Sequence, residues 1–223
     1  MGDIMKIGII GAMDNEIEKF THMFDLKKID DKYNIYNCNY QNKELYIVKS
    51  GIGKVNAAAT TQYLINKCDV EMIINTGCAG SLTSKVKVMD VVISSYVTYH
   101  DFRPLRIMQY STPNNGKILA DDKLIAKVKE VLNDLKITNY HEAIIASGDH
   151  FVTDSIERDR IYEETKADVV DMESASIGHI ATLNNIPFVI LRTISDFADG
   201  QDDFEDKAAH RSSEIIKELL NVI

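Results

Sequence analysis

The chain has 223 residues, 45% of them apolar, which is enough for a sizeable hydrophobic core. Lys and Arg number 25 against 34 Asp and Glu, and this net charge of −9 argues against a protein that neutralises nucleic-acid phosphates or coats anionic lipid. No apolar run could span a bilayer and no signal-peptide pattern is present, so we expect a cytoplasmic protein with neither nucleic acid nor membrane as a partner.

The first part of the chain alternates short apolar runs with helical patterns. Residues 6–12 predict a strand, and residues 13–24 predict a helix with a possible N-cap at Asp14. Residues 33–40 and 44–50 predict the two strands of a hairpin. An alanine-rich helix is expected directly after this hairpin.

The middle of the chain continues this alternation around one long loop. Residues 72–75 and 88–97 predict buried strands, whereas residues 101–117 hold two of the three prolines and predict a mobile or intersubunit loop. Further helices are expected at 121–135, 156–165, 172–183 and 205–220, and further strands at 143–147, 169–170 and 187–194. Alternating strands and helices predict an α/β fold with a largely parallel sheet, whose ligands bind beyond the carboxyl ends of the strands.

Acidic side chains follow several of these predicted strands. Glu16, Glu173 and Asp196 each have a structural alternative role, since Glu16 could offset a helix dipole and Asp196 could cap a helix. Asp168, Asp171 and Glu173 lie close together in the sequence, and we expect only one of them to enter a cleft while the others are solvated. A carboxylate at the edge of an apolar site could accept hydrogen bonds from sugar hydroxyls.

The usual nucleotide, metal and disulfide patterns are missing from the sequence. Gly51-x-Gly53 lacks the third glycine of the dinucleotide fingerprint and there is no P-loop, so we expect these glycines to let the backbone approach a neighbour or an anion. The six histidines lack metal-ligand spacing and are expected mostly on the surface or in loops. Cys38, Cys68 and Cys78 are odd in number and far apart, which predicts reduced thiols.

Six motifs occur in order between residue 7 and about residue 199: GIIGAMDNEIE, SGIGKVNAA, NTGCAGSL, SGDHFV, VVDMESASI and RTISDFAD. Together they resemble the 5′-methylthioadenosine/S-adenosylhomocysteine nucleosidases of the nucleoside phosphorylase superfamily. The resemblance implies a single-domain three-layer α/β/α sandwich over residues 1–223, with a mixed, partly barrel-like central sheet. It also implies a homodimer that hydrolyses an adenine N-glycosidic bond without a metal or other cofactor.

The resemblance further implies roles for individual residues. Glu16 would activate the attacking water and Asp196 would protonate adenine N7, so that charge is neutralised on both sides of the breaking bond. Glu173 would bind ribose hydroxyls, Phe151 would stack on adenine, and Val152 would read the edge of the base. The other residues implied to contact or surround the substrate are Met13, Ile52, Cys78, Ala79, Gly80, Met172, Arg192, Ser195 and Phe204.

The sequence departs from the family pattern near the expected 5′ substituent. Cys78 replaces a serine with a weaker donor, and residues 101–117 lack the family's usual D-V-T-A-F-G-Y. The segment after Asp199 is shorter than in typical relatives, which leaves Phe204 as the candidate aromatic lid. We therefore expect adenine recognition to persist while the preference among methylthioadenosine, S-adenosylhomocysteine and 5′-deoxyadenosine shifts.

Three alternatives remain open on the sequence alone. A purine nucleoside phosphorylase of the same fold would need phosphate where Glu16 places a repelling negative charge. A non-catalytic nucleoside-binding protein would not need the three acidic residues. Arg103 and Arg106 could meet a carboxylate on the 5′ tail, although exposed loop arginines are more often solvated.

Overall fold

One sheet of eleven strands runs through the part of the chain that the computed structural model describes, residues 4–200 and 207–223. The strands are β1 (Met5–Gly11), β2 (Lys27–Asp30), β3 (Ile35–Tyr40), β4 (Lys43–Lys49), β5 (Met72–Asn75), β6 (Cys78–Ser81), β7 (Val91–Tyr99), β8 (Ile118–Leu119), β9 (Tyr140–Ser147), β10 (Val169–Asp171) and β11 (Phe188–Asp196). Their order in the sheet is β2-β3-β4-β1-β5-β11-β6-β10-β9-β7-β8.

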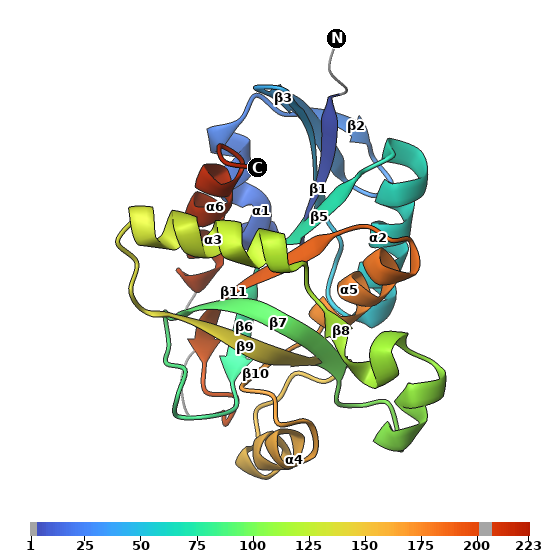
Figure 1. Cartoon of the computed structure of the whole chain (residues 1–223), viewed down its shortest axis with the longest axis vertical. Helices are drawn as coiled ribbons and strands as arrows, with labels where there is room; N and C mark the ends of the chain where they lie inside the picture. Colours follow the sequence, from blue (N-terminus) through green and yellow to red (C-terminus); the bar gives the residue numbers. More distant parts are fainter. Residues whose placement is uncertain (1–3, 201–206) are drawn as a thin grey trace.

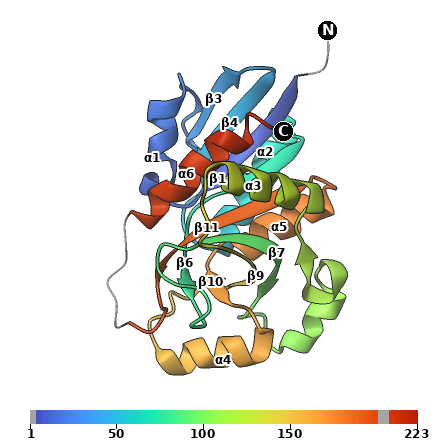
Figure 2. The ribbon, with the colours of Figure 1, turned by 60° about the vertical axis from the view of Figure 1, so that its left-hand side comes forward.

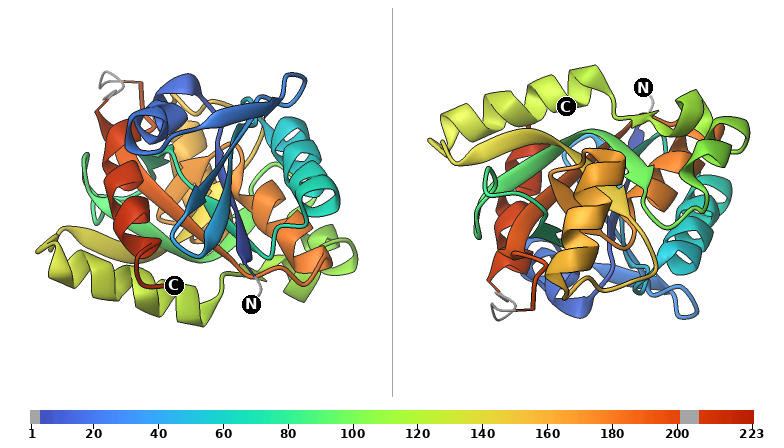
Figure 3. Two further views of the ribbon diagram at one scale, coloured as in Figure 1. Left: turned by 90° about the horizontal axis from the view of Figure 1, so that it is seen from above. Right: turned by 90° about the horizontal axis from the view of Figure 1, so that it is seen from below.

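The helices form two layers that cover the sheet (Figure 1). They are α1 (Asp14–Met23), α2 (Lys54–Cys68), α3 (Asp122–Asp134), α4 (Ser155–Thr165), α5 (Ser174–Leu183) and α6 (Ala208–Leu219), with two short 3₁₀ helices, η1 (Leu105–Tyr110) and η2 (Pro113–Gly116). Helix α6 contacts α1 and α3 on one face, while α2 contacts α5 on the other (Figure 2). Seen from above, the strands lie between these two layers (Figure 3), whereas α4 lies apart from them at the lower end of the molecule (Figure 1).

The sheet closes on itself at one end, because β11 pairs with three other strands. It runs parallel to β5 and β6 and antiparallel to β7. The strands β11, β6, β10, β9 and β7 therefore form a closed ring, which leaves no free edge among them. The expectation of a largely parallel sheet is too simple, since β7 and β10 also run antiparallel to β11 and β6. The three-layer sandwich with a mixed, partly barrel-like sheet is confirmed.

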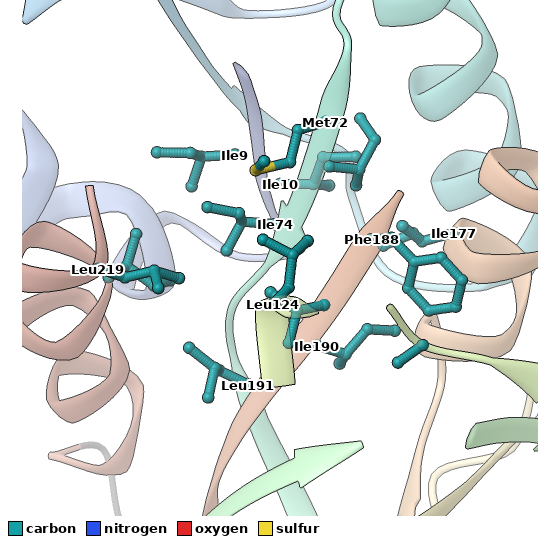
Figure 4. Packing of buried hydrophobic residues seen from close by; sticks show 14 of the residues in the cluster. Ile9, Ile10, Met72, Ile74, Leu124, Ile177, Phe188, Ile190, Leu191 and Leu219 are labelled. Carbon is teal, nitrogen blue, oxygen red and sulfur yellow. The ribbon is translucent and has the colours of Figure 1, made fainter. Parts of the chain in front are cut away.

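The core lies where the ring meets the open part of the sheet (Figure 4). Strands β1, β5 and β11 are apolar on both faces because helices cover both faces. Burial of each large aliphatic side chain contributes about 1.5–3 kcal/mol relative to exposure. The labelled side chains come from these three strands and from α3, α5 and α6: Ile9, Ile10, Met72, Ile74, Leu124, Ile177, Phe188, Ile190, Leu191 and Leu219.

Most predicted elements are present, and the differences have local causes. Strand β6 was not anticipated, because it is only four residues long and includes the small Ala79 and Gly80, which give no strand pattern of their own. Asp14 is the first residue of α1 and pairs with Lys49, while Met13 occupies the cap position, so the cap prediction is wrong. Asp196 ends a strand and does not cap a helix.

Two further expectations concern individual side chains. Cys38, Cys68 and Cys78 are buried and form no disulfide with one another, as expected for reduced thiols. His100 lies in the loop directly after β7, which agrees with the expectation for the histidines, but its side chain is only 1% exposed. None of the described helices is long and apolar enough to cross a membrane. The cytoplasmic location stays a prediction.

Candidate active site

A cavity of about 610 Å³, including its open mouth, lies at the carboxyl ends of β1, β6, β10 and β11. This is the edge at which the alternating pattern predicted a ligand site. The predicted site residues that line it are Met13, Glu16, Ile52, Cys78, Ala79, Gly80, Phe151, Val152, Met172, Glu173, Ser195 and Asp196. Arg192 lies behind this lining, and Phe204 is outside the described residues.

Glu16 lies at the inner end of the cavity, held by backbone donors. Its Oε2 accepts hydrogen bonds from the N–H groups of Ala12 (2.5 Å) and Met13 (3.0 Å), and its Oε1 accepts one from Cys78 N–H (2.9 Å). A Cβ on Gly77 would overlap Oε1, so this residue must be glycine for β6 to come this close. Burial raises the pKa of Glu16 more than the nearby Arg192 and the backbone donors lower it.

Arg192 is buried beneath the cavity and paired with Asp171. Its Nη2 and Nε lie 2.7 and 2.8 Å from Asp171 Oδ2, and its Nη2 lies 3.8 Å from Glu173 Oε2. Burial lowers the pKa of Arg192, but the charges of Asp171, Glu16 and Glu173 outweigh it and raise the pKa overall. Such buried charges are tolerated only when paired, so this arginine and the surrounding carboxylates depend on one another.

Asp171 is the residue for which the expectation from the sequence is wrong. It was expected to be solvated, but it is buried, lines the cavity, and accepts a hydrogen bond from Ser147 Oγ at 2.5 Å. Ser174 also donates to it. Because Arg192 comes from β11, which is distant in sequence from β10, no local pattern reveals the need for this carboxylate.

Glu173 follows β10, and its buried carboxyl group reaches the start of α2. Its Oε1 accepts a hydrogen bond from Gly53 N–H at 2.9 Å. Burial and the negative charge of Asp171 raise the pKa of Glu173 to about 8, against the opposing effects of Arg192 and the Gly53 N–H. A raised pKa means that this carboxyl group takes up or loses a proton near neutral pH.

Asp196 ends β11 and presents its two carboxyl oxygens to different donors. Its Oδ1 accepts a hydrogen bond from Ala198 N–H at 2.8 Å, and its Oδ2 lies 2.7 Å from Ser195 Oγ. Ser195 Oγ also lies 3.3 Å from the carbonyl oxygen of Ala79. A Cβ on Gly80 would be 3.1 Å from Asp196 Oδ1, so the glycine leaves room beside this carboxyl group.

Apolar side chains form the walls and the mouth of the cavity. Val152 is buried, whereas Phe151 and Ile52 are 57% and 50% exposed. Such exposed apolar groups at a concave site are typical of ligand contacts. His150, beside Phe151, also lines the cavity and was missed, although its position next to a predicted base-stacking residue could have signalled it.

Two features outside the cavity bear on the sequence alternatives. Arg103 Nη1 lies 2.7 Å from Glu164 of α4, so in this structure it pairs with a neighbouring carboxylate. Among the described residues, no group of three or more His, Cys, Asp or Glu side chains is arranged to hold a metal ion.

Comparisons with known proteins agree with this architecture. A model of the phosphorylase superfamily matches residues 6–221. A 5′-methylthioadenosine/S-adenosylhomocysteine nucleosidase from Helicobacter pylori is 30% identical with a TM-score of 0.91, covering 99% of both chains. A futalosine hydrolase from Helicobacter pylori strain 26695 is 31% identical with a TM-score of 0.90, also covering 99% of both chains.

A third solved structure extends the comparison to another organism. The 5′-methylthioadenosine/S-adenosylhomocysteine nucleosidase from Neisseria meningitidis, in complex with methylthio-immucillin-A, is 30% identical with a TM-score of 0.90. It matches over 98% of this chain and 99% of its own. The chain therefore belongs to the phosphorylase superfamily and, within it, to the nucleosidase family that includes the 5′-methylthioadenosine/S-adenosylhomocysteine nucleosidases.

Proposed function

We propose that this enzyme hydrolyses the N-glycosidic bond of 5′-substituted adenine nucleosides, such as methylthioadenosine, S-adenosylhomocysteine and 5′-deoxyadenosine. Water adds to the anomeric carbon, the carbon–nitrogen bond breaks, and adenine and a free sugar are released. The observation that carries this proposal is the presence of Glu16, Glu173 and Asp196 around one cavity, although they are far apart in sequence.

Glu16 is the proposed general base. The N–H groups of Ala12, Met13 and Cys78 hold its carboxylate in one orientation, which supports a role in directing a water molecule. Burial raises its pKa, and a base whose pKa approaches the working pH accepts a proton more readily. The water proton passes to Glu16 as the oxygen attacks the sugar.

Asp196 is the proposed general acid. Ala198 N–H donates to Oδ1, so that oxygen already accepts a hydrogen bond. Ser195 Oγ, beside Oδ2, can either donate or accept a hydrogen bond, so Oδ2 is the oxygen better suited to carry the proton. Transfer of that proton to adenine N7 would neutralise the departing base.

The remaining lining residues fit the rest of a nucleoside. The carboxyl group of Glu173 can accept hydrogen bonds from paired ribose hydroxyls. Phe151 supplies an aromatic ring for the adenine base, and Val152 supplies backbone groups for its edge. Met13, Ile52 and Met172 supply apolar surface for the sugar and its 5′ substituent.

Water is a better nucleophile for this site than phosphate. The described residues that line the cavity include no lysine or arginine. Arg192, behind the lining, is already paired with Asp171. A phosphate dianion beside Glu16 would be repelled and would lack cationic partners.

Futalosine is a second candidate substrate for the same chemistry. The chain is as similar to a futalosine hydrolase as to the methylthioadenosine nucleosidases, at about 30% identity in each comparison. The same kind of N-glycosidic bond would be cleaved, while the base would be hypoxanthine in place of adenine and the 5′ group would differ. Residues 101–117, where the sequence departs from the nucleosidase pattern, are the segment expected to decide between these substrates.

We also propose that the protein forms a homodimer through the face made by α2, α5 and η1. Exposed apolar side chains on these elements include Val55, Tyr110 and Leu183. Helix α5 contacts α2 and η2, and η2 in turn contacts η1, so these elements adjoin one another. Light scattering should give twice the chain mass, and Tyr110→Glu should lower it; a monomeric wild-type protein would contradict this proposal.

One assay tests the proposed reaction. The protein is incubated with methylthioadenosine, S-adenosylhomocysteine, 5′-deoxyadenosine and futalosine, with and without phosphate, and the released base and sugar are identified. We expect adenine or hypoxanthine release that is independent of phosphate, with a free sugar as the second product. Formation of a sugar 1-phosphate would overturn the proposal in favour of a phosphorylase.

A further inference from the structure

The start of helix α2 is held by two carboxylates from other parts of the chain. Gly53 N–H donates to Glu173 Oε1 (2.9 Å), and Lys54 N–H donates to Asp149 Oδ1 (2.7 Å). The cap residue of α2, Gly53, has no side chain to satisfy these donors. Asp149 therefore supplies the missing cap from a loop 95 residues away in sequence.

Asp149 is itself fixed by a closed set of contacts. Asp149 N–H donates to Asp101 Oδ2 at 2.9 Å, and Lys54 Nζ lies 2.5 Å from the same Asp101 oxygen. Lys54 Nζ also lies 3.8 Å from Asp149 Oδ2 and 5.7 Å from the centre of the Tyr99 ring. Burial raises the pKa of Asp101, but Lys54 and the Asp149 N–H outweigh it and lower the pKa overall.

The backbone at the start of α2 and in the loop before Phe151 leaves little space for side chains larger than glycine. Gly53 has φ +97°, and a Cβ there would lie 2.9 Å from Asp149 Oδ1. On the opposite side, a Cβ on Gly148 would overlap the ring of His100. Gly53 lets the loop before Phe151 approach the start of α2, which makes the Asp149 contact possible, and Gly148 lets the same loop pack against His100.

The contacts connect two parts of the proposed nucleoside site. Asp149 lies two residues before Phe151, the proposed adenine ring partner, and its contact orients the peptide next to Gly53 N–H. That N–H is a backbone donor to Glu173, which otherwise faces the negative charge of Asp171. Without it, the carboxyl group of Glu173 would lose its orientation toward the sugar.

We propose that Lys54 and Asp149 are positioning residues for ribose recognition, which act by fixing the Gly53 N–H that orients Glu173. The inference rests on the proposed function, in which Glu173 binds the ribose hydroxyls. It adds that discrimination for ribose over a deoxyribose depends on side chains that do not touch the sugar. A displaced binding group can cost up to about 100-fold, so we expect an intermediate loss of about tenfold.

The test compares methylthioadenosine with its 2′-deoxy and 3′-deoxy analogues. In Lys54→Met and Asp149→Ala, the kcat/KM preference for the ribonucleoside should fall about tenfold, while Lys54→Arg should retain it because a guanidinium can still pair with Asp101. Adenine lacks the sugar, so its Kd should stay within twofold and should report an intact fold. Lys129→Met, which removes a surface pair with Glu142 at the same 2.5 Å distance, should change nothing.

A double-mutant cycle with Glu173→Gln completes the test. Lys54→Met should cause no further loss of ribose preference when Glu173→Gln is already present. An equal fall in kcat/KM for ribo- and deoxynucleosides, or an additive cycle, would overturn the inference. If the wild-type protein released no base, the proposed function would fail instead, and the Kd values of the same three nucleosides would still test the positioning role.

Discussion

The inner end of the cavity and its rim are built in different ways. Glu16, Glu173 and Arg192 at the inner end are 3%, 7% and 1% exposed, and each has several polar partners. At the rim, Phe151 and Ile52 are about half exposed and contribute apolar surface. The inner groups are oriented before any ligand binds, whereas the rim side chains can adjust to what enters.

The difference suggests which properties of the enzyme can vary. Each inner charge is compensated by another. Removal of one therefore leaves its partner buried without an opposite charge. Phe151 and Ile52 at the rim lack such mutual dependence, and a substitution there alters chiefly the contacts with the ligand. Bond cleavage should therefore depend on the inner end, while the choice of 5′ group depends on the rim.

The largest effect is expected from the two proposed proton-transfer groups. Glu16→Gln and Asp196→Asn should each lower kcat by about 100- to 10,000-fold, because neither amide can exchange the required proton. Ligand affinity should change much less, since both substitutions keep the shape of the side chain. Steady-state kinetics and calorimetry would measure this, and a loss of kcat below tenfold would place catalysis elsewhere.

A large effect on stability is expected from Arg192. Arg192→Met should lower the free energy of unfolding by about 3–5 kcal/mol, because Asp171 and Glu173 would remain buried without their cation. Urea denaturation would measure it. Lys127→Met, which removes an exposed pair with Glu130, serves as a control and should cost less than about 1 kcal/mol. Equal losses for the two variants would mean that the inner network has no special role.

A smaller effect is expected at the rim. Phe151→Leu should weaken adenine binding by about 1–3 kcal/mol through loss of base stacking. The free energy of unfolding should change by only about 0.5 kcal/mol, because the side chain is 57% exposed. Calorimetric titration with adenine, together with urea denaturation, checks both parts. A stability loss as large as that of Arg192→Met would remove the distinction between inner end and rim.

The smallest effect concerns a single proton on Glu173. With a pKa of about 8, Glu173 is mostly protonated in the unliganded protein at pH 7. Hydrogen bonds from ribose hydroxyls favour its carboxylate, so ligand binding should release up to about one proton. Calorimetry in buffers of different ionisation enthalpy measures this release, and Glu173→Gln should abolish it. Identical heats in all buffers for the wild-type protein would contradict the prediction.

The same group makes stability depend on pH with a defined sign. Folding raises the pKa of Glu173 from 4.5 to about 8, so the unfolded chain loses its proton first as the pH rises. The free energy of unfolding should therefore fall between about pH 4.5 and pH 8 through this group. Glu173→Gln should make that part of the pH profile shallower, as measured by denaturation at several pH values.

Much of the secondary structure follows from local sequence patterns. Helix α3 is an example, because its apolar periodicity and the Asp121 side chain that caps it lie within one short segment. Strand β2 was not anticipated, since its four residues, Lys27–Asp30, are mostly exposed and polar. The order of six motifs was sufficient for the family, the fold and most of the residues around the cavity, but not for Asp171 and His150.

Only the tertiary structure decided which groups depend on one another. It closed the ring between β11 and β7, buried Asp171 under Arg192, and placed Asp149 at the start of α2. These contacts join residues far apart in sequence, and neither hydrophobic periodicity nor capping patterns extends beyond a few turns of chain. The sequence shows which side chains carry a charge. Only the folded chain determines how deeply each charge is buried, and therefore the free energy that this burial costs and the partner that compensates it.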